Sequence, residues 1–357
     1  MTSTRRRATT ASTAASRVVP ARLRPVWLII SLASVAVAAA AGLVVGPVDI
    51  SGVEVVRQVV GMHTDLSTQQ AAIIEQIRLP RVLLALLVGG TLSLSGAGYQ
   101  GVFNNPLADP YLLGAAAGAG LGVTIVIAGT ASTGSTPVGA PVAAFAGALG
   151  AVALAYALGA AGRGRTSTAS LILSGVAVAS FLTAMQTYLL QRNQDTIREV
   201  YSWLLGRLSG AGWHEVLLML PYCAVSWVAL LAHRRVLDVM ALGDDEAATL
   251  GLHPGRSRII VIVAASLGTA AAVSVSGLIG FVGIIVPHFV RMVAGRSNRV
   301  VLPLSLIFGA AFLCAADLLA RTLSAPAEIP IGVVTAFFGA PFFVIVLRAS
   351  RRTGITS

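Results

Sequence analysis

Lysine is absent from this chain of 357 residues, in which all 25 basic residues are arginine. A P-loop places a lysine on the nucleotide phosphates, and a Schiff-base enzyme needs a primary amine. The chain by itself therefore contains neither a P-loop motor nor a Schiff-base lysine.

Charged residues are scarce as well. They make up 11% of the chain, against 56% hydrophobic residues and a mean hydropathy of +0.83, whereas soluble domains carry about 25% charged residues. This composition predicts an all-α, polytopic membrane protein. The net charge of +11 would suit a nucleic-acid binder, but the placement of the arginines described below indicates membrane topology, so we expect no nucleic-acid partner.

Cysteine and other metal ligands are few. Cys223 and Cys314 each lie inside an apolar segment, which predicts buried free thiols and no disulfide framework. The five histidines are scattered, with no HxxxH motif and no Cys–His cluster. We therefore expect no metal site and no cofactor.

Apolar stretches of the length that crosses a bilayer, about 20 residues, occur ten times. They lie near residues 26–46, 80–102, 111–130, 138–161, 169–190, 214–232, 259–277, 279–295, 302–322 and 331–348. The stretch 279–295 is short and contains Pro287, so we expect a bent span there. Residues 51–77 and 195–210 are predicted to form partial helices outside the membrane core.

The arginines set the predicted orientation. With the N-terminus inside and ten spans, 18 arginines fall on inner segments and seven on outer ones, as the positive-inside rule requires. Both termini are then cytoplasmic and the protein is a multi-pass protein of the cell membrane. Residues 1–25 are predicted to be a disordered basic tail, 26–348 the transmembrane domain and 349–357 a second cytoplasmic tail.

Residues 233–258 form a long polar interval between two apolar segments. Asp244, Asp245 and Glu246 begin its central stretch and Gly251 ends it, which predicts a short helix with acids favourably placed in its first turn. A charged, helix-forming insert between spans indicates a docking site for another protein. A solvated loop that merely connects two spans is the alternative.

Polar residues also interrupt apolar helices elsewhere. In residues 94–114, Asp109 either faces a protein-lined path or caps a helix turn at the membrane interface. Asp317 and Arg321 are four residues apart and are expected to pair on one helix face. The segments 95–101 and 276–283 share a weak similarity that hints at two related halves.

Five motifs occur in an order that resembles a known family. They are NNPLADPYLLG (104–114), LILSGVAVAS (171–180), LGDDEAATLGL (242–252), GFVGIIVPHFVR (280–291) and EIPIGVVTAFFGAPFF (328–343). Together they resemble the FecCD-type permease subunits of ATP-driven (ABC) importers for iron–siderophore complexes, haem and vitamin B12. The resemblance covers roughly residues 70–348.

The resemblance implies a type II ABC importer permease with ten spans per subunit. Such permeases form a homodimer, or a heterodimer of paralogous subunits, around the substrate path. Two ATPase subunits dock on the cytoplasmic face and an extracytoplasmic binding protein delivers the substrate, which we expect to be an iron chelate, a ferric siderophore before haem or cobalamin. The chain would be a transport subunit and not an enzyme.

The resemblance also assigns site residues. The ATPase-coupling residues would be Leu242, Gly243, Asp244, Asp245, Glu246, Ala247, Leu250 and Gly251. Arg78, Arg81 and Arg321, at the outer ends of spans, would dock the binding protein through exposed ion pairs that steer encounter. Asn105 and Leu107, with Ser167 and Thr168, would form the cytoplasmic gate.

Two other classes of function would each need features of their own. An intramembrane enzyme would need a nucleophile or metal motif, and the HExxH pattern that His214 and Glu215 begin fails because Leu218 stands in place of the second histidine. An ion-coupled secondary transporter is compatible with polar groups at broken helices. It predicts uptake that follows the membrane potential and no ATPase that co-purifies.

Overall fold

The computed structural model describes residues 23–131, 139–161 and 167–352. Most of the predicted N-terminal tail, and residues 353–357 of the C-terminal one, lie outside these ranges. Seven helices within them are long and apolar enough to cross a membrane, by length and composition, and three shorter helices are apolar too. Together they give the ten predicted spans, so the all-α polytopic fold is confirmed.

The helices that correspond to the ten predicted spans are α1 (Pro25–Val44), α4 (Leu79–Phe103), α5 (Ala115–Ala131), α6 (Ala140–Ala160), α7 (Thr168–Arg192), α9 (Trp213–Ala232), α12 (Pro254–Ser276), α13 (Val282–Val293), α14 (Asn298–Thr322) and α15 (Ile331–Arg352). The remaining elements are α2 (Gly52–Val60), α3 (Thr68–Ala72), the π-helix η1 (Ile73–Arg78), the 3-10 helix η2 (Gln194–Thr196), α8 (Ile197–Leu204), α10 (Arg234–Met240) and α11 (Asp244–Thr249).

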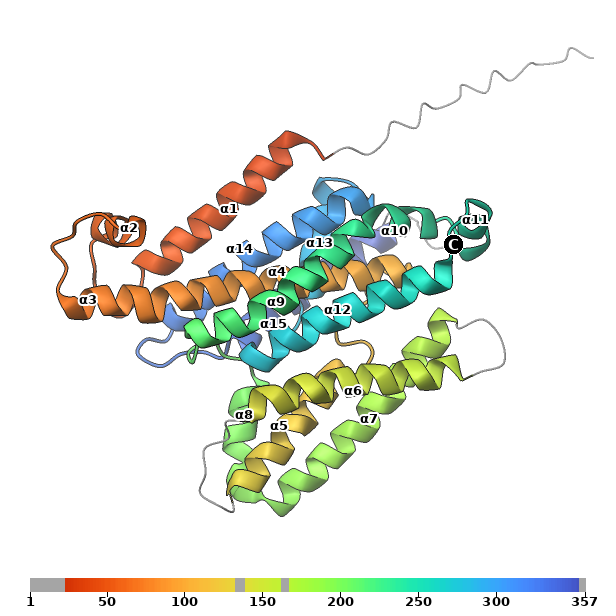
Figure 1. Cartoon of the computed structure of the whole chain (residues 1–357), viewed down its shortest axis with the longest axis horizontal. Helices are drawn as coiled ribbons and strands as arrows, with labels where there is room; N and C mark the ends of the chain where they lie inside the picture. Colours follow the sequence, from red (N-terminus) through yellow and green to blue (C-terminus); the bar gives the residue numbers. More distant parts are fainter. Residues whose placement is uncertain (1–22, 132–138, 162–166, 353–357) are drawn as a thin grey trace, which may run out of the picture.

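Helix α4 is the centre of the bundle. It packs against α14, α12, α13, α9 and α1, and most of its residues are buried. Helices α5, α6 and α7 form a second group that joins the first through contacts of α6 and α5 with α12. In Figure 1 the start of α1 and the end of α15 lie on the side of the bundle that carries α10 and α11.

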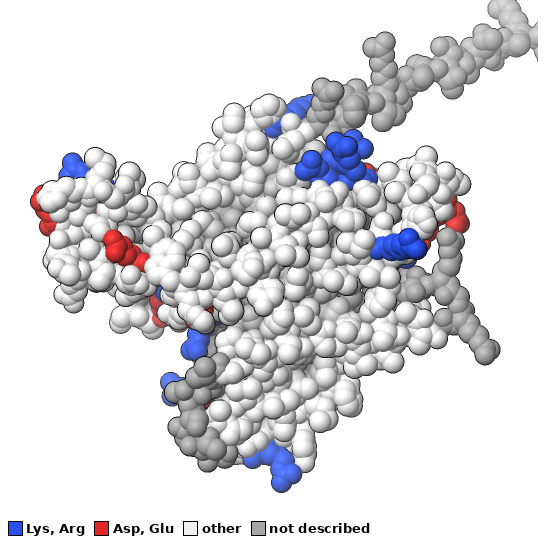
Figure 2. Space-filling view, viewed as in Figure 1, with Lys and Arg blue, Asp and Glu red and all other residues white. Residues whose placement is uncertain are grey.

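On one face of the bundle, charged side chains lie near the two ends (Figure 2). Figure 2 shows arginines and acids near the two ends of the helices on this face, with an uncharged surface between them. Such a belt suits the hydrocarbon core of a bilayer, where charged side chains are costly. The distribution agrees with the hydropathy of the ten helices.

Two predicted elements are shorter than expected. The span predicted from residue 111 begins at Ala115, because residues 104–114 form turns: Asn104 has φ +48° and the Asp109 carboxylate accepts a hydrogen bond from Tyr111 N (2.7 Å). Residues 51–77 do not form one partial helix. They break after α2 at Gly61, whose φ of +75° suits glycine.

Helix α13 is a short helix packed against the middle of α4. The chain leaves α12 at Gly277 (φ +69°), and α13 begins only at Val282, after Phe281 in the left-handed region (φ +69°). A Cβ added at Gly96 of α4 would overlap the carbonyl oxygen of Gly283. The two weakly similar segments therefore lie against each other, with glycine allowing the backbones to approach.

This close approach predicts a stability effect. Replacing Gly96 with alanine forces α4 and α13 apart, at a cost of about 1–3 kcal/mol for an overpacked core site. The matched control is Gly150→Ala in α6, where no atom lies within 4 Å of the added Cβ and alanine favours the helix. Thermal unfolding in detergent should show a lower Tm for Gly96→Ala than for Gly150→Ala, and equal Tm values would contradict the packing argument.

Candidate functional site

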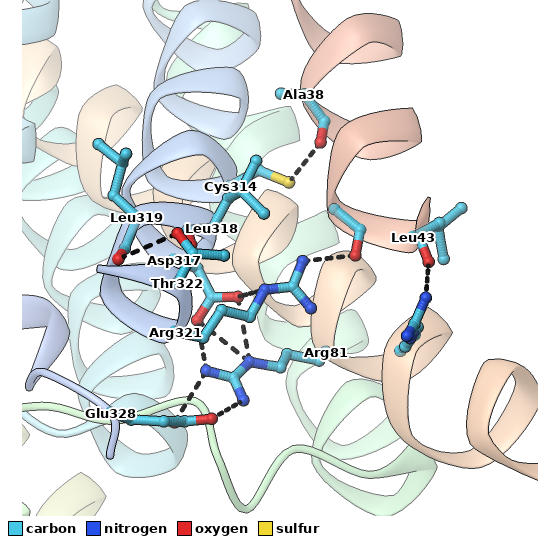
Figure 3. Close-up of polar contacts among 12 residues, drawn as sticks. Ala38, Leu43, Arg81, Cys314, Asp317, Leu318, Leu319, Arg321, Thr322 and Glu328 are labelled. Carbon is cyan, nitrogen blue, oxygen red and sulfur yellow. Dashed lines mark hydrogen bonds and ion pairs between the residues drawn. The ribbon is translucent and has the colours of Figure 1, made fainter. Parts of the chain in front are cut away.

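Arg81 in the first turn of α4 binds two carboxylates at once. Its Nε and Nη2 donate to Asp317 of α14 at 2.9–3.1 Å, and its Nη1 and Nη2 donate to the two oxygens of Glu328 at 2.7 and 3.0 Å. Figure 3 shows the guanidinium held between these two acids. The Arg321 guanidinium lies 3.9 Å from Asp317, so the predicted pair forms as part of a larger cluster.

Arg78 and Arg321 hold the end of α1. Arg78 donates to the carbonyls of Leu43 and Val44 (both 2.8 Å), and Arg321 donates to the carbonyl of Gly42. These carbonyls belong to the last turn of α1, where the helix provides no donors of its own. Cationic side chains there also interact favourably with the helix dipole, so the two arginines act as a C-terminal cap supplied by other helices (Figure 3).

The expected exposure of the docking arginines is wrong. Arg78, Arg81 and Arg321 are 3%, 8% and 8% exposed, and the contacts above engage each of them inside the chain. The physical reason is that Asp317 and the carbonyls at the end of α1 are themselves buried polar groups that need donors. A role of these arginines in binding-protein docking stays a prediction.

Glu328 is the member of this cluster to which the sequence interpretation gave no role. It lies in the EIPIG motif, before α15, and its side chain is 39% exposed while that of Asp317 is 3% exposed. The signal available in the sequence was an acid within a Pro- and Gly-rich junction between two spans. Its partner Arg81 lies 247 positions away in the sequence, so no local pattern indicated the pair.

At the other end of the bundle, α10 and α11 form the insert between α9 and α12. Asp238 of α10 caps α14, accepting from Asn298 N (2.5 Å) and Ser297 Oγ (2.6 Å). The Asn104 side chain at the end of α4 donates to the carbonyl of Met240 (3.3 Å). These bonds tie the insert directly to the two helices that carry the Arg81 cluster.

Helix α11 is the short acidic helix that the sequence predicts. Its acids lie in the first turn, and Gly251 (φ +82°) follows its end, with Leu252 N bonded to Ala247 O (3.1 Å). Arg258 of α12 bonds the Asp244 carboxylate at 3.0 Å, which fixes α11 to a third helix. The preceding helix, α10, was not predicted.

The outer surface of α11 mixes acid and apolar side chains. Ala247 is buried, whereas Leu242 and Leu250 are 65% and 64% exposed and flank the exposed Asp245 and Glu246. Two exposed leucines that flank a fixed six-residue helix are suited to a hydrophobic partner surface. Of the eight predicted coupling residues, Ala247 supports the helix and Gly243 (φ +124°) and Gly251 shape its ends.

The predicted gate residues lie in two separate segments, the turns after α4 and the start of α7. Asn105 Oδ1 accepts from Leu107 N (2.9 Å), and Ser167 Oγ caps α7 by accepting from Ser170 N (3.0 Å), next to Thr168. Leu107 and Ser167 are exposed. The bonds of Asn105 and Ser167 stay within their own segments, so the gate stays a prediction.

Within residues 23–131, 139–161 and 167–352, no three His, Cys, Asp or Glu side chains are arranged to hold a metal ion. Cys223 and Cys314 are free and buried. The polar contacts described above are ion pairs, helix caps and backbone clamps, which hold elements in place.

The chain has ten spans and a helix-bearing insert that is tied to α4 and α14. This arrangement is that of an ABC importer permease. The model of the FecCD transport family matches residues 32–349, and the chain belongs to this family. It is the permease subunit of an ABC importer, in which the ATPase is a partner chain.

The relatives differ in what they carry. The cobalamin import permease BtuC of Halobacterium salinarum is 45% identical over 276 residues, 77% of this chain and 73% of that protein. The hemin transport permease HmuU of Yersinia pestis is 39% identical over 78% of this chain and 84% of that protein. The Fe(3+)-citrate permease YfmD of Bacillus subtilis is 36% identical over 80% and 84% respectively.

A solved structure has the same fold along its whole length. It shows an inward-facing conformation of a proposed metal-chelate type ABC transporter, with a TM-score of 0.81 and 29% identity, and the match covers 91% of this chain and 100% of that one. The architecture described above is therefore that of a known transporter class.

The buried cluster predicts a large effect of removing Arg81. Arg81→Met removes the hydrogen bonds to the buried Asp317 and leaves only the Arg321 guanidinium, 3.9 Å away, beside it; breaking a buried pair in this way costs about 3–5 kcal/mol. The control Arg57→Met breaks the Arg57–Glu54 pair, whose arginine is 47% exposed, at a cost of about 0–1 kcal/mol. Unfolding in detergent should separate the two variants, and Arg81→Met with Asp317→Leu should recover part of the loss. Equal losses in the two single variants would refute a buried, stabilising role for Arg81.

Proposed function

We propose that this chain forms the translocation path of a binding-protein-dependent importer for a metal chelate, driven by two ATPase subunits that dock on α11. The observation that carries the proposal is the exposed acid-and-leucine surface of α11. Arg258 holds α11 on α12, and Asn104 and Asp238 hold the preceding helix α10 on α4 and α14. A force applied to α11 would be transmitted to these helices without an intervening flexible segment.

The orientation follows from the same proposal. Docking of the ATPase places α10, α11 and both termini in the cytoplasm, in agreement with the excess of arginine on those segments. The Arg81 cluster then lies at the outer face, where the extracytoplasmic binding protein arrives. Asn105, Leu107, Ser167 and Thr168 fall on the cytoplasmic side, where a gate of short uncharged side chains would let a large chelate pass.

The path itself requires a second subunit in this proposal. Leu173 and Phe181 of α7 and Phe337 of α15 are large, exposed apolar side chains, and such faces contact either lipid or another subunit. We infer a homodimer, with a paralogous heterodimer as the alternative. The subunit ratio of the purified complex, measured by native mass spectrometry, distinguishes the two.

For the substrate, the family resemblance alone favoured a ferric siderophore. The second candidate is cobalamin, favoured by the 45% identity to a cobalamin import permease against 39% and 36% to hemin and Fe(3+)-citrate permeases. Both are large preformed complexes whose metal arrives already coordinated. The protein would therefore recognise the shape of the chelate and need not ligate its metal.

Reconstitution tests both the class and the substrate. The permease is placed in nanodiscs with the ATPase and the binding protein encoded beside it, and ATP hydrolysis is measured with a ferric siderophore, haem or cobalamin. We expect one compound to stimulate hydrolysis. Uptake that follows membrane potential and needs no ATPase would contradict the proposal in favour of a secondary transporter.

The docking surface predicts a specific assembly defect. Leu250→Asp should weaken ATPase association by about tenfold or more, because the change places an unpaired carboxylate in a contact that the proposal buries. Glu246→Arg should act in the same direction, while Asp244 is left intact because its replacement would also lose the bond to Arg258.

The matched control is Val60→Asp, an exposed apolar residue of α2 at the opposite end of the bundle. Co-purification of ATPase with the permease is the measurement. Assembly of Leu250→Asp at the level of Val60→Asp would rule out α11 as the docking element.

A further inference from the structure

Helix α2 turns a stripe of valines away from the rest of the described chain. The exposed fractions of Val53, Val56, Val59 and Val60 are 61%, 56%, 42% and 68%. Because neighbours on one helix face recur every three or four positions, these four valines share a face. The fifth valine of α2, Val55, is 1% exposed and lies in a small buried cluster. Of the five, the described chain buries Val55 alone.

The polar face of α2 fixes the direction in which this stripe points. Glu54 accepts hydrogen bonds from Arg57 (2.8 Å) and from Asp65 N (3.2 Å), and Gln58 donates to the Glu75 carboxylate of η1 (2.7 Å). These bonds hold the polar side of α2 against the segment that leads into α3 and η1. The valine stripe is therefore held outward, and α2 cannot turn it inward without breaking them.

Helix α2 also lies at a defined level of the bundle. The 20 residues of α1 extend about 30 Å, the thickness of the hydrocarbon core of a bilayer, so Val44 lies at the boundary of that core. Arg78 of η1 donates to the carbonyls of Leu43 and Val44 (both 2.8 Å), which places η1 at the same level. Because α2 packs against α1 and η1 at the end of the bundle remote from α11 (Figure 1), it lies where hydrocarbon meets the lipid headgroups.

The stripe continues an apolar surface that begins on α1. Ile29 and Val37 of α1 are 66% and 69% exposed, and the exposed Val45 and Val48 follow in the segment between α1 and α2. In a spanning helix, exposed side chains of this kind face lipid. A helix of nine residues is marginal in water, and valine adds little helix propensity. Burial of the stripe in the same lipid would therefore stabilise α2.

We propose that α2 is an interfacial helix, seated on the bilayer with Val53, Val56 and Val60 against the acyl chains of the leaflet at the end of α1. Amphipathic helices bind in this way with their apolar face about 5–10 Å into the boundary between headgroups and acyl chains. Seated there, α2 holds the end of α1 and the start of the α4 helix at a fixed depth. The role goes beyond the proposed transport function and does not depend on it.

The test measures what surrounds a nitroxide spin label on this face. The complete transporter with its ATPase is placed in vesicles of phosphatidylcholine and phosphatidylglycerol, without the binding protein. The variant is Val56→Cys, with Val37→Cys in α1 as the lipid-facing reference and Gln69→Cys in α3 as the exposed polar reference. Since Cys223 and Cys314 are buried, the unsubstituted protein treated with the same reagent gives the background. Oxygen enters lipid and a hydrophilic nickel chelate stays in water, so the ratio of their effects on the label reports its surroundings.

The ratio of the oxygen effect to the nickel effect at Val56 should be several-fold higher than at Gln69 and close to that at Val37. Val53→Cys, at a second position of the stripe, should give the same result. ATPase co-purification should be unchanged in both variants, because α11 lies at the opposite end of the bundle (Figure 1).

Two outcomes overturn the lipid contact. A ratio at Val56 equal to that at Gln69 places the stripe in water. A label that both reagents fail to reach is covered by protein, such as a second subunit, instead of lipid. Either result leaves the importer function intact, since that function is tested by ATP hydrolysis in the presence of substrate.

Discussion

The ion pair between Arg81 and Asp317 is the contact on which the end of the bundle opposite α11 depends. Both side chains are almost fully buried, and a buried charge is tolerated only when its partner and hydrogen bonds are in place. The pair joins α4 to α14, the two helices in closest contact in the bundle. Because Glu328 accepts two further hydrogen bonds that Arg81 donates, the junction before α15 is fixed to the same point.

The same two helices anchor the opposite end. Asn104 follows the last residue of α4 and bonds the end of α10, and Asp238 of α10 caps the first turn of α14. Helices α4 and α14 therefore connect the Arg81 cluster directly to the insert. They pack closely, with glycine at their contact, since a Cβ on Gly309 would overlap Ser93 of α4. Interfaces packed this closely favour rigid-body movement over continuous deformation. In the proposed importer, docking on either face would act on the same pair of helices.

The spans and the acidic helix of the insert were predictable because their signals are local: about 20 apolar residues, or acids followed by a glycine. Contacts between residues far apart in the chain could not be predicted from the sequence. Arg81 meets acids 236 and 247 positions away, and nothing near Arg81 distinguishes a buried, paired arginine from an exposed docking one. Likewise, the left-handed backbone of Phe281 and the start of α13 beside Gly96 depend on packing against α4. Local sequence preferences carry no information about that packing.

The exclusive use of arginine suits these positions. At Arg81 one guanidinium binds two carboxylates in a planar fork, and at Arg78 one guanidinium reaches the carbonyls of Leu43, Val44 and Val48. A lysine ammonium is a compact, strongly hydrated charge with three donors and no such geometry. Since its desolvation cost is higher and its donors are not pre-arranged, a lysine at either site would leave buried acceptors unsatisfied. Arginine therefore serves here as a structural cross-link between helices as well as a topological signal.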